Sequence, residues 1–148
     1  MISKSCKYAI RATVFIASQA ANKRKLGVKE IAEEIEAPPA FTAKILQILN
    51  KHKIVTSLKG PYGGFFCEAY QLNLPVIDIV NAIDGTAVFK ECVMGLHLCS
   101  DEHPCPMHHQ YAEIRNKLRQ SFENTTLGSL AGDLSGGNVY LKNNPLGI

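Results

Sequence analysis

Three cysteines and two histidines lie in one short stretch of the sequence, where they could hold a metal centre. The spacing is C-x6-C-x5-C-x2-H-H, formed by Cys92, Cys99, Cys105, His108 and His109. Thiolates are soft anionic ligands that select zinc or iron–sulfur clusters. Structural zinc sites usually space paired cysteines by about two to four residues, and this stretch has no such pair. The wider spacing favours a loop wrapped around something larger than one ion, such as an iron–sulfur cluster.

The cysteine count fits this interpretation but leaves two others open. The chain has 5 cysteines, an odd number that argues against a disulfide framework. The cluster interpretation competes with a zinc site and with thiols that are buried and inert. If a helix begins at Pro106, His108 lies in its first turn, on about the same side as Cys105.

A helix is expected directly after the last cysteine. Apolar residues recur there at spacings of four, three, four and four, starting from Met107, which predicts a helix of about four to five turns. An exposed apolar stripe invites aggregation unless a partner covers it. We therefore expect a dimer formed through the remaining residues of the stripe, Tyr111, Ile114, Leu118 and Phe122.

The N-terminal half predicts a winged helix-turn-helix. Ser3 or Ser5 can cap a first helix that continues to about residue 21. Helical patterns over 28–35 and from about residue 40 to 52 are separated by Pro38 and Pro39, and two helices joined by a tight break fit helix-turn-helix.

The segment after these helices predicts a wing. A strand over 53–58, a Gly-rich turn over 59–64 and a return strand from residue 65 would form a β-hairpin, and a short helix is expected over 75–83. The fold class is therefore mainly α with a small β-hairpin wing and a long dimerisation helix. We expect a DNA-binding domain over 1–85, a cysteine-rich loop over 86–109, the rest of the dimer helix over 110–125, and a flexible tail over 126–148.

The charge distribution indicates a polyanionic partner. Residues 1–60 hold eleven Lys or Arg and four acidic residues, whereas residues 61–148 hold five and nine. In a helix-turn-helix the second helix reads base edges in the major groove, while scattered cations contact phosphates. The candidate DNA contacts are Lys4, Lys7, Arg11, Lys29, Ala40, Thr42, Ala43, Lys44, Gln47, Lys59, Gly60, Tyr62 and Gly63.

Four stretches of the chain resemble the Rrf2 family of winged-helix regulators. They are Lys7–Ala12, residues 31–46, the wing sequence Gly60–Phe65, and the three cysteines at 92, 99 and 105. The resemblance covers roughly residues 1–125. It implies a homodimer that binds an imperfect palindrome in double-stranded DNA. It also implies an iron–sulfur cluster on the three cysteines, 2Fe–2S or alternatively 4Fe–4S, that reports iron supply, redox state or nitric oxide.

The fourth ligand is where this sequence departs from parts of the family. The nitric-oxide-sensitive branch takes an acidic ligand near the start of the first helix, but no acid precedes Glu30 here. The cluster-regulator branch uses a histidine that maps to His108, although its first cysteine interval is one residue shorter. The resemblance therefore implies His108 as the ligand, with His109, His97, His103 and Cys6 as alternatives.

The remaining sequence signals exclude other classes. No catalytic triad, nucleophile elbow or phosphate loop is present, so we expect a regulator and not an enzyme. No apolar run approaches the ~18 residues of a membrane span and no signal-peptide pattern is present, so we expect a cytoplasmic protein. The alternative function is a cluster-free or zinc-bound regulator that acts through a protein partner.

Overall fold

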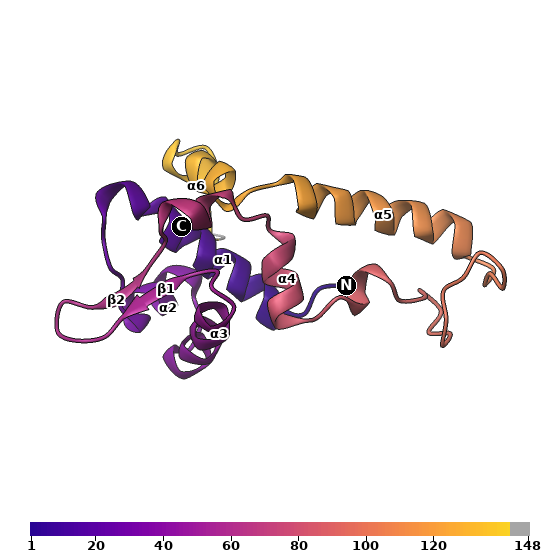
Figure 1. Ribbon diagram of the computed structural model, residues 1–148, viewed down its shortest axis with the longest axis horizontal. Coiled ribbons are helices and arrows are strands. Elements are labelled where there is room, and N and C mark those ends of the chain that lie inside the picture. The colour runs from indigo at the N-terminus through magenta and orange to yellow at the C-terminus, as the bar shows by residue number, and fades with distance from the viewer. Residues whose placement is uncertain (143–148) are drawn as a thin grey trace.

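The first helix, α1 (Lys4–Ser18), lies at the centre of the domain. In the computed structural model, which describes residues 1–142, the Ser3 hydroxyl accepts a hydrogen bond from the Cys6 amide at 3.0 Å and so caps this helix. A short 3-10 turn, η1 (Ala20–Asn22), follows it. The buried face of α1, which includes Ala12 and Ile16, packs against α2, α3, α4 and α6 (Figure 1).

Helices α2 (Val28–Ile35) and α3 (Pro39–Lys51) form the helix-turn-helix. Glu36 adopts a left-handed conformation with φ 56°, which ends α2, and Pro39 stands at the start of α3, where its missing N–H costs nothing. Ile35 and Leu46 are fully buried between the two helices and α1, so the pair is fixed as one rigid unit.

The wing is a two-stranded antiparallel hairpin of β1 (Thr56–Leu58) and β2 (Gly64–Phe66). The predicted first strand begins three residues too early. Lys53 has φ 59°, and the Ile54 amide still bonds to the Leu49 carbonyl, so this stretch closes α3 instead of pairing with β2. A bridge between Leu26 and Phe65 ties the hairpin to the domain.

The segment after the wing anchors the base of the hairpin through Gln71, which lies on the short turn η2 (Ala69–Asn73). Gln71 is fully buried; its Nε2 donates to the Lys53 carbonyl at 3.0 Å and its Oε1 accepts from the Glu68 amide at 2.8 Å. Helix α4 (Ile77–Ile83) and the turn η3 (Ala87–Phe89) then lead to the cysteine-rich loop.

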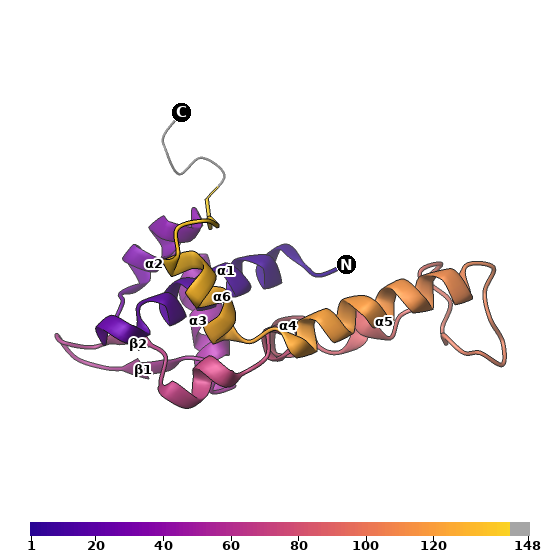
Figure 2. The same ribbon diagram turned by 90° about the horizontal axis from the view of Figure 1, so that it is seen from above.

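Helix α5 (His108–Asn124) projects from the domain as a long arm, with the cysteine-rich loop at its far end (Figures 1 and 2). The fold class is the predicted one, mainly helical with a two-stranded wing. Among the described residues, no helix is long and apolar enough to cross a membrane.

The beginning of the expected tail is a helix. Thr126 caps α6 (Leu127–Ser135) by accepting from the Ser129 amide at 3.1 Å, and Leu127 and Ala131 are buried against α1. The apolar spacing of this segment outweighs its glycines, so the prediction of a flexible tail from residue 126 is wrong over α6. The part of that prediction that concerns residues 143–148 lies outside the described residues.

Candidate metal centre and DNA-binding surface

The tip of the arm brings the predicted cluster ligands together in two pairs, Cys92 with Cys105 and Cys99 with His108. Cys92 and Cys105 are 9% and 8% exposed, and His108, the first residue of α5, is 5% exposed. Cys99 is half-buried beside them, with its Sγ 3.2 Å from His108 Nδ1. The eight-residue segment 92–99 and the four-residue segment 105–108 therefore meet through two contacts, Cys92 with Cys105 and Cys99 with His108.

The backbone around Cys92 is arranged to stabilise a thiolate. The Leu96 and Met94 amides lie close to its sulfur and, together with the neighbouring Cys105 thiol, lower the pKa of Cys92. The Gly95 amide donates to the Cys92 carbonyl at 3.0 Å. Gly95 has φ 76°, a left-handed conformation that glycine adopts without strain and that turns the chain back around the sulfur. Amides directed at sulfur are also what anionic metal–thiolate centres require.

Cys105 lies beside Cys92, and its pKa shifts in the opposite direction. Burial, and secondarily the neighbouring Cys92, raises the pKa of the Cys105 thiol, against the effect of the Met107 amide. The proximity of these two sulfurs is what a shared metal centre would use, because ligation replaces the thiol protons with the metal.

Two neighbours of the site, Asp101 and Arg115, were missed by the sequence analysis. Asp101 Oδ1 lies 2.8 Å from His108 Nε2. Arg115 Nη1 donates to the Cys99 sulfur at 3.2 Å and to the Glu91 carbonyl at 2.8 Å. Arg115 lies two helical turns after His108 and hence on the same face of α5, which is a signal the sequence did contain.

The donor set fits an iron–sulfur cluster or a zinc ion. The alternatives to His108 as fourth ligand are placed less well: His97, His103 and His109 are exposed. Cys6 lies in the core against Val80, where burial, and secondarily Asp84, raises its pKa to about 12.

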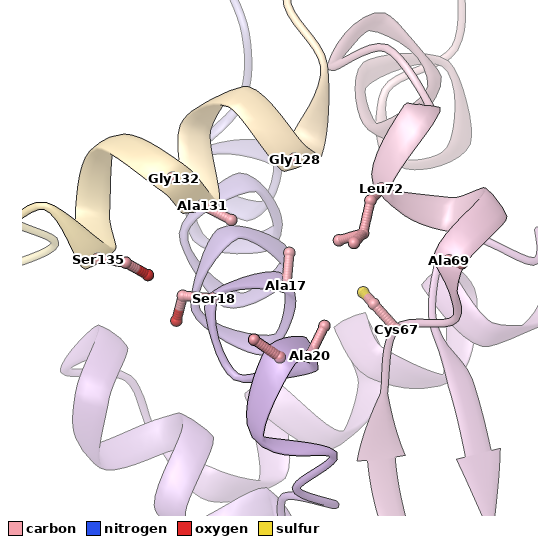
Figure 3. Close-up of a pocket in the computed structure, with 11 residues that line it drawn as sticks. Ala17, Ser18, Ala20, Cys67, Ala69, Leu72, Gly128, Ala131, Gly132 and Ser135 are labelled. Atoms are coloured by element: carbon pink, nitrogen blue, oxygen red, sulfur yellow. The ribbon is translucent and has the colours of Figure 1, made fainter.

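Cys67 lies in a separate pocket between α1, η2 and α6. The pocket has a volume of about 360 Å³, and Figure 3 shows the Cys67 sulfur among small side chains that include Ala17 and Ala20. Burial raises the pKa of the Cys67 thiol to about 12. A neutral thiol among alanines and glycines offers packing and no ligand chemistry.

Helix α3 presents a polar face to solvent, as a recognition helix requires. Ala40, Lys44 and Gln47 are exposed and Ala43 is half-buried. Thr42 was expected on this face but is fully buried, and its hydroxyl donates to the Pro38 carbonyl at 3.0 Å. Thr42 shares the helical face of Ile45 and Leu46, so the prediction that it contacts DNA is wrong.

The other candidate DNA contacts surround α3. Exposed positions are found on α1, on α2 and at the wing tip: Lys4, Lys7, Lys29, Lys59, Gly60 and Tyr62. Arg11 is half-buried, with its guanidinium 5.3 Å from the centre of the Tyr8 ring. A side chain on Gly63 would place its Cβ 1.9 Å from the Leu58 carbonyl oxygen, so Gly63 has a structural role in the turn of the wing.

The predicted dimer stripe divides into two parts. Ile114 is 64% exposed, and Tyr111 is half-buried. Leu118 and Phe122 instead pack on their own chain, and the Phe122 ring meets Phe89 edge-on with centroids 5.9 Å apart. The Phe122 ring therefore anchors the arm to its own domain, and its contact with a partner stays a prediction.

A winged helix-turn-helix with a basic N-terminal half and a thiol-bearing arm defines a DNA-binding transcription regulator. The chain belongs to the Rrf2 family, described as iron-dependent transcriptional regulators, whose family model matches residues 2–133. It is 30% identical over 132 residues to a predicted HTH-type transcriptional regulator of Aquifex aeolicus, covering 88% of this chain and 90% of that protein. The relatives are regulators and not enzymes.

Further relatives carry more specific names. The chain is 23% identical over 127 residues to the HTH-type transcriptional regulator IscR of Vibrio vulnificus, covering 86% of this chain and 74% of that one. Two solved structures share the fold. CymR, the global cysteine regulator of B. subtilis, aligns with a TM-score of 0.73 at 20% identity over 90% of this chain and 97% of its own. IscR of T. potens aligns with a TM-score of 0.71 at 18% identity over 94% and 91%.

Proposed function

We propose that this regulator senses redox, iron or nitric oxide status through an iron–sulfur cluster bound by Cys92, Cys99, Cys105 and His108. The observation that carries the proposal is the contact of Cys99 Sγ with the buried His108 ring, 3.2 Å from Nδ1, next to the neighbouring pair of Cys92 and Cys105 thiols. Three thiolates and one neutral nitrogen suit a 2Fe–2S cluster, which would supply a centre able to change charge by one electron.

The residues around the site would tune it. Asp101 would hold the His108 ring by accepting from Nε2, which leaves Nδ1 facing the thiols. The Arg115 guanidinium would offset negative charge at the Cys99 sulfur. Both residues would fix orientation and charge at the site without ligating the cluster.

The DNA-binding form would be a homodimer on an imperfect palindrome. The exposed side chains of α3, Lys44 and Gln47, would enter the major groove, and the wing tip at Lys59 and Tyr62 would contact the backbone or the minor groove. The exposed N-terminal half of α5 around Ile114 would form the dimer contact. Because one arm would carry both the dimer contact and the cluster ligand His108, the state of the cluster could alter the spacing of the two recognition helices.

An anaerobic purification tests the cluster directly. We expect coloured protein with iron and sulfide in stoichiometric amounts, and loss of colour in Cys92→Ser, Cys99→Ser or Cys105→Ser. Cys67→Ser is the matched control, because Cys67 is buried in the separate pocket between α1, η2 and α6. A colourless wild type that contains stoichiometric zinc would overturn the cluster and support the zinc alternative.

The sensing step has its own measurement. DNA affinity of the cluster-loaded and cluster-free protein, compared at fixed salt because phosphate contacts make binding salt-dependent, should differ by about tenfold or more, which needs only ~1.4 kcal/mol of coupling. If the cluster-loaded and cluster-free proteins bind DNA with equal affinity, the cluster has only a structural role.

A further inference from the structure

His108 offers its two ring nitrogens to two different surroundings. Nδ1 lies 3.2 Å from the Cys99 sulfur, while Nε2 faces away from the thiols and lies 2.8 Å from Asp101 Oδ1. His109 is the next residue, and its ring is 5.2 Å from the His108 ring at an interplanar angle of 81°. One donor atom from each of Asp101, His108 and His109 fits within 4.8 Å of the others.

We propose that Asp101, His108 and His109 form a second, mononuclear site for a divalent first-row transition cation, on the side of His108 opposite the thiols. Two imidazoles and one carboxylate are the donor set that Fe²⁺, Co²⁺ and Zn²⁺ accept with solvent in the remaining positions. The site uses none of the thiols, and it shares only His108 with the proposed cluster.

The three side chains can close on an ion without moving the fold. Metal bonds of about 2.0–2.2 Å require donor atoms roughly 3–4 Å apart, so the present separation must shrink slightly. His108 is held by burial, whereas the Asp101 side chain is 90% exposed and His109 is exposed, so these two are free to rotate inward. The Asp101 carboxylate also supplies the negative charge that a cation needs.

The two nitrogens couple the two metal environments through the single ring proton of His108. A neutral imidazole ligates through one nitrogen and carries its proton on the other. A cation on Nε2 leaves the proton on Nδ1, where it can be donated to the Cys99 sulfur. A ligand bond from Nδ1 instead leaves the proton on Nε2, where it is donated to Asp101. This coupling rests on the proposed cluster function, but the cation site itself does not.

Cobalt(II) distinguishes the two environments, because thiolate ligands give strong near-ultraviolet charge-transfer bands and nitrogen and oxygen ligands give only weak visible bands. The probe is Co²⁺ added to the full chain carrying Cys92→Ser, Cys99→Ser and Cys105→Ser together, with circular dichroism to verify folding. We expect one Co²⁺ per chain with no charge-transfer band. Adding Asp101→Asn or His109→Ala should weaken binding by about tenfold or more, since changes even to groups behind a ligand have effects of that size.

The matched control is His103→Ala, an exposed histidine of the same loop. It should leave Co²⁺ affinity unchanged. No Co²⁺ binding by the folded triple variant, or an equal loss in His103→Ala and His109→Ala, would overturn the proposal.

A second measurement needs no cysteine change and so covers the case in which the triple variant does not fold. In the reduced wild-type chain with excess Zn²⁺, long-range ¹H–¹⁵N spectra report which imidazole nitrogens are ligated. We expect shifts at His108 Nε2 and at one nitrogen of His109, with His103 unchanged. A shift at His108 Nδ1 without any change at His109 would show that zinc binds only with the thiols, and would overturn the second site.

Discussion

Replacing Phe122 tests whether the base of the arm belongs to its own domain or to a partner. The Phe122 ring meets the buried Phe89 ring edge-on, with centroids 5.9 Å apart, and packs against both core clusters of the domain. Ile114, eight residues earlier on the same helix, is 64% exposed. The structure thus assigns different roles to two apolar residues that the sequence pattern treats alike.

The magnitude follows from the contacts that are lost. An edge-to-face aromatic pair contributes about 0.5–1.5 kcal/mol beyond its buried area. Truncating a fully buried Phe to Ala costs about 3–5 kcal/mol, and Phe122→Leu on this half-buried residue keeps most of the apolar volume. We expect the free energy of unfolding to fall by about 1–2 kcal/mol.

The assay must separate folding from dimer formation, because the stability of a dimer depends on concentration. Denaturant unfolding is therefore measured in an Ile114→Glu background, where the proposed dimer contact is lost. Sedimentation equilibrium measures dimer affinity for Ile114→Glu and Phe122→Leu as separate single variants. If Phe122→Leu weakens the dimer but leaves the stability of the Ile114→Glu chain unchanged, Phe122 faces a partner and the assignment is refuted.

Three further predictions concern the recognition helix, the wing and the buried thiols. Thr42→Val should keep the preference among DNA sequences, whereas Gln47→Ala should broaden it, as measured by competition binding at fixed salt, because only Gln47 is exposed. Gly64→Ala should lower the melting temperature, since Gly64 has φ +143° and a Cβ there would lie 2.8 Å from a backbone oxygen; strain of this kind costs about 1–3 kcal/mol. Burial raises the pKa of both Cys6 and Cys67 from 9.0 to about 12. Between these values the unfolded chain loses protons that the folded chain keeps, so the free energy of unfolding should fall as pH rises.

Each of these has a control within the chain. A Cβ at Gly27 would have no atom within 4 Å, so Gly27→Ala should change the melting temperature little. A chain with Cys6→Ala and Cys67→Ala should lose most of its alkaline slope, and an unchanged slope would contradict the assignment to these thiols. If Thr42→Val loses its preference among DNA sequences, Thr42 contacts DNA after all.

The sequence was sufficient wherever one local signal determined the structure. The paired prolines placed the start of α3, and the serine before the first apolar repeat placed the start of α1. Thr42 was misplaced although its signal was present, because it lies three and four residues before Ile45 and Leu46 and so shares their buried face.

Other features depend on contacts between distant residues. The repeat in α5 shows that Phe122 needs an apolar partner, but periodicity cannot tell that the partner is Phe89 of the same chain. The flexible tail predicted over 126–148 was wrong where α6 forms, since composition carries no information about the α1 face that covers this helix. The pairing of Asp101 with His108 depends on the path of an irregular loop, which no periodicity describes.

The α5 arm also constrains which changes of length the chain can tolerate. His108 and Phe122 are 14 residues apart in the numbering of the chain, which at about 100° per residue brings them within ~40° of one another around the helix axis. Inserting one residue between them would lengthen the arm by only ~1.5 Å but would rotate the cysteine-rich loop by about 100° relative to the wing. An insertion of seven residues would restore the angle to within ~20° while moving the loop about 10 Å outward. The length of the arm should therefore vary among related chains in steps of about two helical turns. The angle of the loop around the helix axis constrains the arm more than its length does.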